Sequence, residues 1–177
     1  LNYRVDFIHE SPRQVARSFL NQQGIKTREK RTGAPDLVLG WKGFTEQYIL
    51  SEIFALLVES QSDLTVELKS ALGGTKIVFE ALKRGDIDVY PEYTGTGLLV
   101  TLKPEPEVIK DLIRDQEAVF QYVKEKFSKR FNLYWSKPLG FNNSYDLMMR
   151  KTHAKELGIQ TISDLKKFAH TIVEAKN

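Results

Sequence analysis

The chain has 177 residues, enough for one domain with a sizeable core, or for a domain and a fragment of a second. Its 41% hydrophobic and 28% charged residues are typical of an ordinary globular protein. The net charge of +3 is too small, and the basic residues are too mixed with acidic ones, to indicate a nucleic-acid partner. Without cysteine there is no disulfide or thiolate chemistry, and no apolar run reaches the roughly 18 residues of a membrane span.

Residues 1–25 predict a short strand followed by a helix. Apolar and polar residues alternate through residues 1–8, the pattern of an edge strand. Ser11 and Pro12 then form a typical helix start, as N-cap and first helical residue, and Gly24 ends the helix. The helix has one apolar face, formed by Val15, Ala16, Phe19 and Leu20. The polar N-terminus lacks a signal-peptide pattern, so an exported protein would be a processed chain.

Residues 26–36 are highly charged and contain Gly33 and Pro35, which is typical of a linker. A basic patch for an acidic partner is the alternative. It is the weaker interpretation, because aromatic residues do not interleave with the basic ones.

Strand and helix patterns alternate through the next hundred residues. The predicted strands are residues 37–40, 64–69 and 86–90, and the predicted helices are residues 45–60, 75–84 and 107–128. Thr45 is the expected N-cap of the first of these helices, and Gly85 ends the second. This βαβα order predicts a mostly parallel sheet.

The C-terminal part predicts shorter elements. Asn132–Trp135 and Tyr145–Met149 have strand patterns, whereas His153–Leu157 and Ile162–Phe168 have helix patterns. Ser163 is the expected N-cap of the last helix.

Candidate catalytic or metal-binding groups are few. The histidines are scattered and lack ligand spacing: His9, His153 and His170. Acidic residues near the third strand form a conceivable catalytic pair, but turn capping and solvent contact explain them better: Glu80, Asp86, Asp88 and Glu92. No nucleophile motif or phosphate-binding loop is present, so the sequence predicts no enzyme activity, catalytic residue, metal or cofactor.

The most informative stretch runs from a glycine turn to a pair of tyrosines. Gly73 and Gly74 allow a tight turn that leaves backbone N–H groups uncovered. Tyr90 and Tyr93 follow the third strand, at the rim where open α/β sheets bind ligands. Taken alone, these aromatic residues are also consistent with a core or rim position.

A trimethylammonium group would suit such aromatic residues. It cannot donate a hydrogen bond, so electron-rich ring faces and apolar walls must hold it. A zwitterionic ligand would also need donors for its carboxylate. The backbone of residues 73–75 and the side chains of Gln47, Asn142 and Asn143 are suitable.

Four segments together resemble one known family. They are GWKGFTEQYILSEIFALLVE, LGGTKIVFEALKRGDIDVYPEYTGTG, WSKPLGFNNSYDLMMRK and TISDL. They are similar to segments of the ABC-transporter substrate-binding proteins for glycine betaine, choline and related quaternary ammonium compounds. The segments cover about residues 37–165 in the family's order, which makes the resemblance specific.

The resemblance implies an α/β fold, a periplasmic-binding-protein-like lobe with a mostly parallel sheet and an incomplete second lobe. Residues 37–140 would form the first lobe, and residues 141–177 the crossover and part of the second. Residues 1–25 resemble the family's C-terminal segment, here placed first and followed by the linker of residues 26–36. An excerpt across two tandem domains, a permuted or trimmed chain and a diverged natural protein would each explain this order.

The resemblance also implies a function. The protein would capture glycine betaine, choline, carnitine or a similar compound outside the cytoplasm, in the periplasm or at the cell surface, and deliver it to an ABC permease of the membrane. The alternative is an isolated lobe that serves as a structural or interaction scaffold. Carried over position by position, the ligand-binding residues would be Phe44, Thr45, Gln47, Gly74, Thr75, Tyr90, Tyr93, Phe141, Asn142, Asn143 and Tyr145.

The apolar face of the N-terminal helix requires a partner surface. We expect Phe19 and Leu20 to contact the core formed by residues 37–128, because the linker is long enough to let the helix reach it. Docking on a second copy of the chain, as a domain swap, is the alternative.

Overall fold

The computed structural model describes residues 1–28, 33–69, 73–143 and 147–168. The chain divides into two compact units, Leu1–Lys137 and Pro138–Asn177. Within the described ranges, each helix is too short or too polar to cross a membrane.

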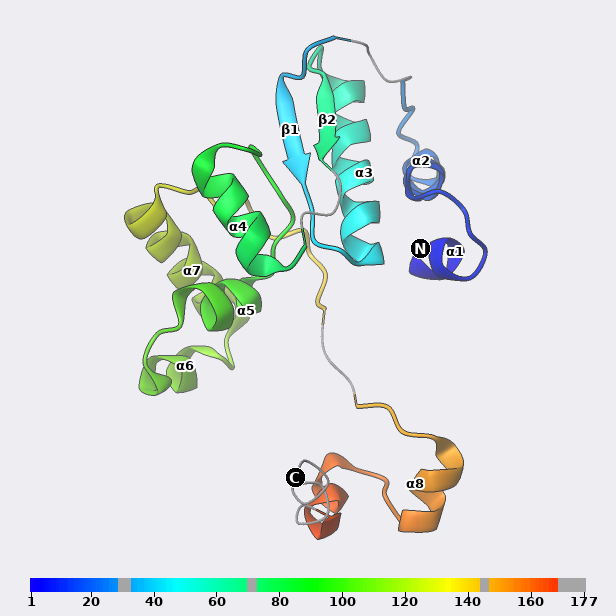
Figure 1. The fold of residues 1–177 in the computed structure, drawn as a ribbon, viewed down its shortest axis with the longest axis vertical. Helices are drawn as coiled ribbons and strands as arrows, with labels where there is room; N and C mark the ends of the chain where they lie inside the picture. The colour runs from blue at the N-terminus through cyan, green and yellow to red at the C-terminus, as the bar shows by residue number, and fades with distance from the viewer. Residues whose placement is uncertain (29–32, 70–72, 144–146, 169–177) are drawn as a thin grey trace. The chain divides into compact units, whose positions relative to one another are not determined.

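The first unit contains a small parallel sheet (Figure 1). Strand β1 (Leu37–Gly40) pairs in parallel with β2 (Val66–Lys69). On its other edge, Leu39 of β1 forms a parallel bridge with Val89, and backbone hydrogen bonds of 2.8 and 2.9 Å join the two segments. The predicted parallel arrangement is therefore confirmed, although the expected strand over residues 86–90 is reduced to a single bridge.

Two helices follow the strands in the predicted order. Helix α3 (Thr45–Gln61) packs on the sheet, and helix α4 (Thr75–Arg84) ends at Gly85. Gly85 has φ +77°, the left-handed conformation that favours glycine at a helix end. The expectation that Thr45 is the N-cap is wrong, because Phe44 holds that position without a side-chain cap.

The N-terminal residues are helical, so the expected edge strand over residues 1–8 is wrong. Residues Asn2–Asp6 form helix α1, and the rings of Tyr3 and Phe7 stack with centroids 5.2 Å apart. A spacing of four residues places two side chains on one helix face, whereas a strand would hold them far apart. The short period-two pattern was therefore ambiguous.

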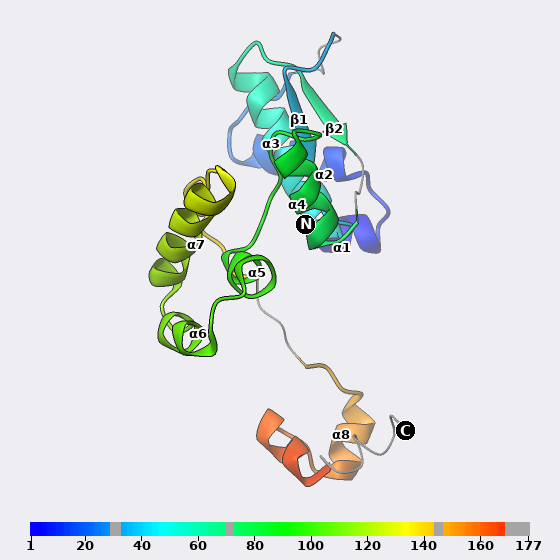
Figure 2. The same ribbon diagram turned by 60° about the vertical axis from the view of Figure 1, so that its left-hand side comes forward.

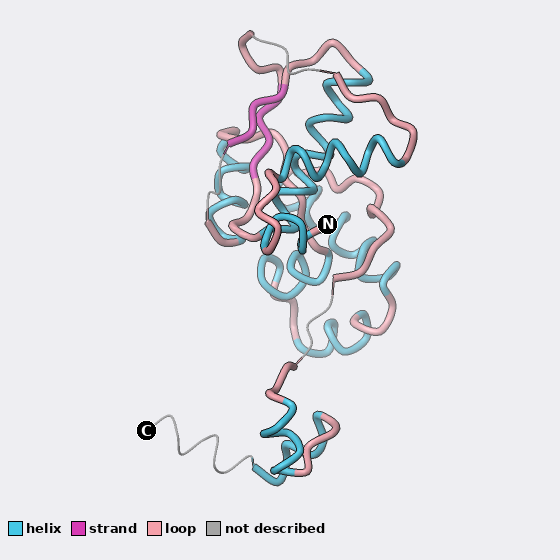
Figure 3. Tube along the Cα trace, turned by 90° about the vertical axis from the view of Figure 1, so that its right-hand side faces the viewer, coloured by secondary structure: helices cyan, strands magenta, loops and turns pink. Residues whose placement is uncertain are grey.

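Helix α2 (Pro12–Gln22) begins as predicted and lies against α3 (Figures 1 and 3). Ser11 and Gln14 form a reciprocal capping box with hydrogen bonds of 3.2 Å. Leu20 is buried together with Ala16 and Leu56 of α3, and Phe19 packs against this cluster. The prediction that Phe19 and Leu20 contact the 37–128 core is confirmed within a single chain.

The first unit continues with a series of helices (Figure 2). The series consists of α5 (Thr94–Thr96), the π-helix η1 (Gly97–Leu102), α6 (Pro106–Leu112) and α7 (Gln116–Phe131). The expected single helix over residues 107–128 is thus two helices. The break occurs because the Asp115 carboxylate accepts hydrogen bonds from the backbone of Glu117 and Ala118, at 3.0 and 3.1 Å, and caps a new helix.

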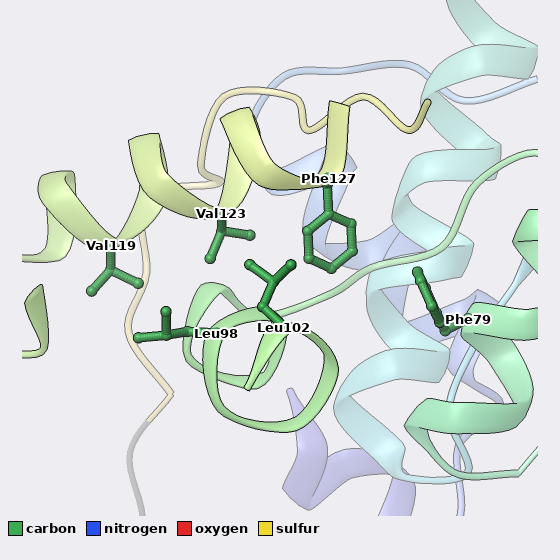
Figure 4. Packing of buried hydrophobic residues seen from close by; sticks show 6 residues of the cluster. All are labelled: Phe79, Leu98, Leu102, Val119, Val123 and Phe127. Atoms are coloured by element: carbon green, nitrogen blue, oxygen red, sulfur yellow. The ribbon is translucent and has the colours of Figure 1, made fainter. Parts of the chain in front are cut away.

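A cluster of buried apolar residues joins α4, η1 and α7 (Figure 4). Its members are Phe79, Leu98, Leu102, Val119, Val123 and Phe127. Asn132 ends α7 with φ +56°, and the expected strand over Asn132–Trp135 is absent from this described segment. Leu133 and Trp135 pack on the cluster instead. Their apolar character therefore reflects core packing rather than sheet pairing.

Gly97, the first residue of η1, packs closely against α7 and the segment after it. A Cβ at this position would come within 3.0 Å of both Val123 and Trp135. We expect Gly97→Ala to lower the free energy of unfolding by about 1–3 kcal/mol through overpacking. Gly95→Ala is the matched control, because a Cβ there meets open space. Equal stability of the two variants in denaturant titrations would contradict this packing.

The second unit contains α8 (Lys151–Leu157) and the 3₁₀-helix η2 (Ile162–Phe168), both at the predicted positions. The expectation that Ser163 is the N-cap is wrong, because Ser163 lies inside η2. The carboxylate of Asp164, also inside η2, reaches back and accepts hydrogen bonds from the backbone of residues 160 and 161 at 3.0 and 2.8 Å. These bonds lower the pKa of Asp164. Residues 147–149 are not a strand, and the rest of the strand expected over Tyr145–Met149 lies outside the described residues.

Candidate functional site

Two aromatic rings come together at the edge of the sheet. Phe44 follows β1, and Tyr93 follows the bridge at Val89 and precedes α5. Because parallel strands end at the same edge, Phe44 and Tyr93, 49 positions apart in the sequence, become neighbours there. The rings stack with centroids 6.2 Å apart and planes 24° apart, and Phe44 is 40% exposed. The ring pair therefore presents an aromatic surface at the ligand edge of the sheet.

The hydroxyl of Tyr93 is fixed by the first turn of α3. Gln47 Nε2 donates a hydrogen bond to the hydroxyl oxygen over 3.2 Å, and the hydroxyl donates to the carboxylate of Glu46. Gln47 is fully buried, and its Oε1 accepts a 3.4 Å hydrogen bond from the backbone N–H of Lys42. Gln47 thus links the β1–α3 turn to the tyrosine.

A buried ion pair lies beside the rings and was missed from the sequence. Lys42 is only 4% exposed, and its ammonium group pairs with the carboxylate of Glu92. Lys42 Nζ lies 4.8 Å from the centroid of the Tyr93 ring and 5.9 Å from that of Phe44, within the range of cation–π attraction. The available signal was a charged residue close to each aromatic: Lys42 two positions before Phe44, and Glu92 between Tyr90 and Tyr93.

Glu92 is the point at which these contacts meet. Its carboxylate also accepts hydrogen bonds from the Tyr93 backbone N–H at 2.8 Å and from the Tyr90 hydroxyl at 3.1 Å. Burial, followed by the charge of Glu92 and this hydrogen bond, raises the pKa of Tyr90. The Tyr90 hydroxyl therefore stays protonated and donates, while its ring packs against the buried cluster of α4 and Ile87.

The glycine turn lies next to the same loop. The backbone N–H of Gly43 donates to the carbonyl of Gly73 over 3.3 Å. Gly74 is the N-cap of α4 and Thr75 its first residue. The hydroxyl of Thr45 is engaged elsewhere, since it donates to the carboxylate of Asp6 over 2.6 Å.

The remaining site candidates belong to the second unit or lie outside the described residues. Phe141, Asn142 and Asn143 are exposed residues of a segment without helix or strand. Tyr145 lies outside the described residues. Their participation in one site with Tyr93 stays a prediction.

The other acidic residues near the third strand have structural partners. The Asp88 carboxylate accepts the backbone N–H of Val38 at 2.7 Å, and Asp86 pairs with Arg84. Glu80 pairs with Lys83. Glu92 alone among the four joins the aromatic cluster.

Comparison with known proteins places this arrangement in context. Residues 35–177 match the family model OpuAC, described as the substrate-binding domain of the ABC-type glycine betaine transport system. The ergothioneine transport permease/ergothioneine binding protein EgtU of Helicobacter pylori strain G27 is 42% identical over 132 residues, which are 73% of this chain and 22% of EgtU. The carnitine transport binding protein OpuCC of Listeria monocytogenes is 35% identical over 73% of this chain and 40% of OpuCC.

Two further comparisons agree. A glycine-betaine-binding protein of Pseudomonas aeruginosa strain PAO1 is 37% identical over 75% of this chain and 40% of its own length. The structure of apo YehZ from Escherichia coli matches with a TM-score of 0.56 and 27% identity, over 78% of this chain and 47% of YehZ. The chain therefore spans less than half the length of each of these relatives, and the comparison with YehZ confirms the predicted periplasmic-binding-protein-like fold.

Proposed function

Because the chain belongs to the family of substrate-binding domains of ABC-type glycine betaine transport systems, we propose that it is part of a binding protein that captures a quaternary ammonium compound. Its relatives are named for ergothioneine, carnitine and glycine betaine. These three compounds share a trimethylammonium group and an anionic group. The proposed ligand class is therefore a trimethylammonium zwitterion, with choline as a cation-only variant.

The stacked ring pair of Phe44 and Tyr93 is the observation that carries this proposal. Two ring faces at the ligand edge of the sheet suit a cation that cannot donate a hydrogen bond. Each desolvated cation–π contact contributes about 2 kcal/mol. The Tyr93 hydroxyl is held by α3, so the ring is oriented before the ligand arrives.

The rest of the site would supply donors and further walls. In this proposal, the backbone at Gly74 and Thr75 and the side chains of Gln47, Asn142 and Asn143 bind the anionic part of the ligand. By the family resemblance, Phe141 and Tyr145 are also proposed as ligand-binding residues. Thr45, the first residue of α3, and Tyr90 are proposed at the margin of the site: the Thr45 hydroxyl is bonded to Asp6, and the Tyr90 hydroxyl to Glu92.

The proposed partner is an ABC permease of the membrane, and the proposed location is outside the cytoplasm, where such a permease collects its substrate.

A second proposed partner is another copy of the chain, with α1 and α2 exchanged between the two copies. Such an exchange would form between two chains the same contacts that α2 makes with α3 in one chain. A dimer whose amount rises with protein concentration would support such an exchange.

Tyr93→Ala tests the proposal. We expect it to weaken binding of glycine betaine by roughly 1–2 kcal/mol or more, which is about a fivefold to thirtyfold change in Kd, because the ring face is lost. Tyr93→Phe keeps the ring and should cost less. Binding is measured by titration calorimetry or, where it is weak, by NMR titration.

Tyr134→Ala is the control, because Tyr134 is 80% exposed and also lies near a lysine ammonium group, that of Lys124, 5.8 Å from its ring centroid. It should leave the Kd unchanged. Equal losses for Tyr93→Ala and Tyr93→Phe would show that the hydroxyl, rather than the ring, holds the ligand. No binding by the unmodified chain would favour the scaffold alternative.

A further inference from the structure

Helix α1 is held in place mainly by polar contacts at its two ends, because all five of its residues are at least partly exposed. The guanidinium group of Arg4 donates to the carboxylate of Glu10, with Nε at 2.7 Å, and to the hydroxyl of Ser18 on α2 over 3.1 Å. The carboxylate of Asp6 accepts the hydroxyl hydrogen of Thr45 over 2.6 Å. This short helix is therefore tied to α2 on one side and to the first turn of α3 on the other.

The contact with Asp6 reaches the middle of the aromatic site. Thr45 lies between Phe44, whose ring stacks on Tyr93, and Glu46, whose carboxylate accepts the Tyr93 hydroxyl. The hydrogen bond from the Thr45 side chain fixes the piece of backbone from which both neighbours extend. Asp6, 39 positions earlier in the sequence, is thus one residue away from each of the two contacts that orient Tyr93.

The start of α3 lacks a cap of its own. Backbone N–H groups at a helix start have no partners within the helix, and a negative charge near them is favourable. Phe44 occupies the N-cap position and has no side-chain oxygen to accept a hydrogen bond. Asp6 brings a carboxylate to this end from another helix. Because helix ends fray more easily than helix centres, a fixed first turn is what keeps Phe44 and Glu46 in register with Tyr93.

We propose that Asp6 is a positioning residue of the ligand site: it holds the start of α3 so that the rings of Phe44 and Tyr93 are stacked before a ligand arrives. This inference rests on the proposed function, because it concerns the same ring pair. It gives α1 a role in binding that is separate from the packing of α2 on α3. In this role Asp6 acts through Thr45 and does not touch the ligand.

Asp6→Ala tests the inference, because it removes the acceptor of the Thr45 hydroxyl. We expect the Kd for trimethylglycine to rise about threefold to tenfold. Asp6→Asn keeps a side-chain oxygen that can accept the same hydrogen bond, and it should restore most of the affinity. Asp111→Ala is the matched control, since it removes an exposed carboxylate from α6, and it should leave the Kd unchanged.

Thr45→Val tests the same bond from its other side. The double variant Asp6→Ala/Thr45→Val should bind trimethylglycine as well as Thr45→Val does, because the two substitutions remove one shared interaction. This comparison is insensitive to any direct contact between Thr45 and the ligand, since both proteins lack the hydroxyl. A further loss of affinity on adding Asp6→Ala would show that Asp6 acts by another route, and it would overturn the inference.

The free protein gives a second readout that needs no ligand. Nuclear Overhauser contacts between the ring protons of Phe44 and Tyr93 should be present in the unmodified chain and in Asp6→Asn, and weaker in Asp6→Ala. Amide hydrogen exchange in α2 should be the same in all three proteins. Faster exchange in α2 of Asp6→Ala would mean that Asp6 holds the whole N-terminal segment rather than the ring pair, which would also overturn the inference.

The outcomes separate the two proposals. If trimethylglycine binds the unmodified chain and Asp6→Ala with the same Kd, the inference about Asp6 fails and the proposed function stands. If trimethylglycine binds neither protein, the proposed function fails, and the ring contacts in the free proteins decide whether Asp6 positions the ring pair.

Discussion

Phe127→Ala should lower the free energy of unfolding of the Leu1–Lys137 unit by about 3–5 kcal/mol. Phe127 is 3% exposed and makes edge-to-face contacts with three other rings. The centroid distances are 5.7 Å to Phe79, 5.4 Å to Phe131 and 5.3 Å to Trp135. Truncation would remove the side chain that joins α7 to α4 and would leave a cavity that these rings cannot close. The predicted loss is a large part of the stability of a small domain.

Urea titrations followed by tryptophan fluorescence provide the measurement, because Trp135 contacts Phe127 directly. Phe127→Leu is the control, since it keeps most of the apolar volume and should cost less than half as much. A loss below about 1 kcal/mol for Phe127→Ala would mean that α7 is not packed on α4 as described.

Arg13→Ala should destabilise the docking of α2 on α3 by about 3 kcal/mol or more. Arg13 donates to Glu52 over 2.9 Å and to Glu59 over 2.8 Å. Glu59 is 1% exposed, and its Oε1 has no hydrogen-bond partner among the described residues. Without Arg13, the buried carboxylate of Glu59 would lose its counter-charge. The destabilisation from an unpaired buried charge is larger than the stability that the intact ion pair contributes.

The measurement is amide hydrogen exchange in α2, which should accelerate toward the rate of an unfolded segment while the sheet stays protected. Arg13→Met/Glu59→Met is the control, because it replaces the pair by apolar side chains of similar length and should restore most of the protection. Unchanged exchange in Arg13→Ala would show that the apolar contacts of Leu20 with Leu56 are sufficient by themselves.

The elements with strong local signals could be predicted from the sequence. Ser11 with Pro12 marks the start of α2, and Gly85 marks the end of α4, because each residue satisfies a backbone requirement of the helix end. The parallel pairing followed from the order of strands and helices. Sequence patterns were therefore sufficient to predict those features that residues close together in the chain determine.

Predictions failed where a short stretch fits both the strand and the helix period, or where a single side chain determines where a helix begins. Residues 1–8 alternate over too short a stretch to separate strand from helix, and the stacking of Tyr3 on Phe7 is consistent only with the helix. The break before α7 depends on the Asp115 cap inside an otherwise continuous helical pattern. The apolar residues after α7 pack in the core, although their pattern resembles a strand.

For the site, Phe44 and Tyr93 were each predicted as ligand-binding residues from the family motifs, but their stacking was not predicted, and the structure brings the two rings together. The pairing of Lys42 with Glu92 could not be predicted in the same way, because 50 residues separate them and only the folded sheet edge makes them neighbours. Charged residues beside aromatics are usually exposed, and nothing in the local pattern indicates that this pair is buried.

The central claim is that the Phe44–Tyr93 pair receives the cation of a quaternary ammonium ligand. The most direct measurement is an NMR titration of the chain with trimethylglycine, followed by nuclear Overhauser contacts from its N-methyl protons. We predict saturable binding, with contacts to the ring protons of both Phe44 and Tyr93. Saturable binding with N-methyl contacts elsewhere, or no saturable binding at tens of millimolar ligand, would contradict the claim.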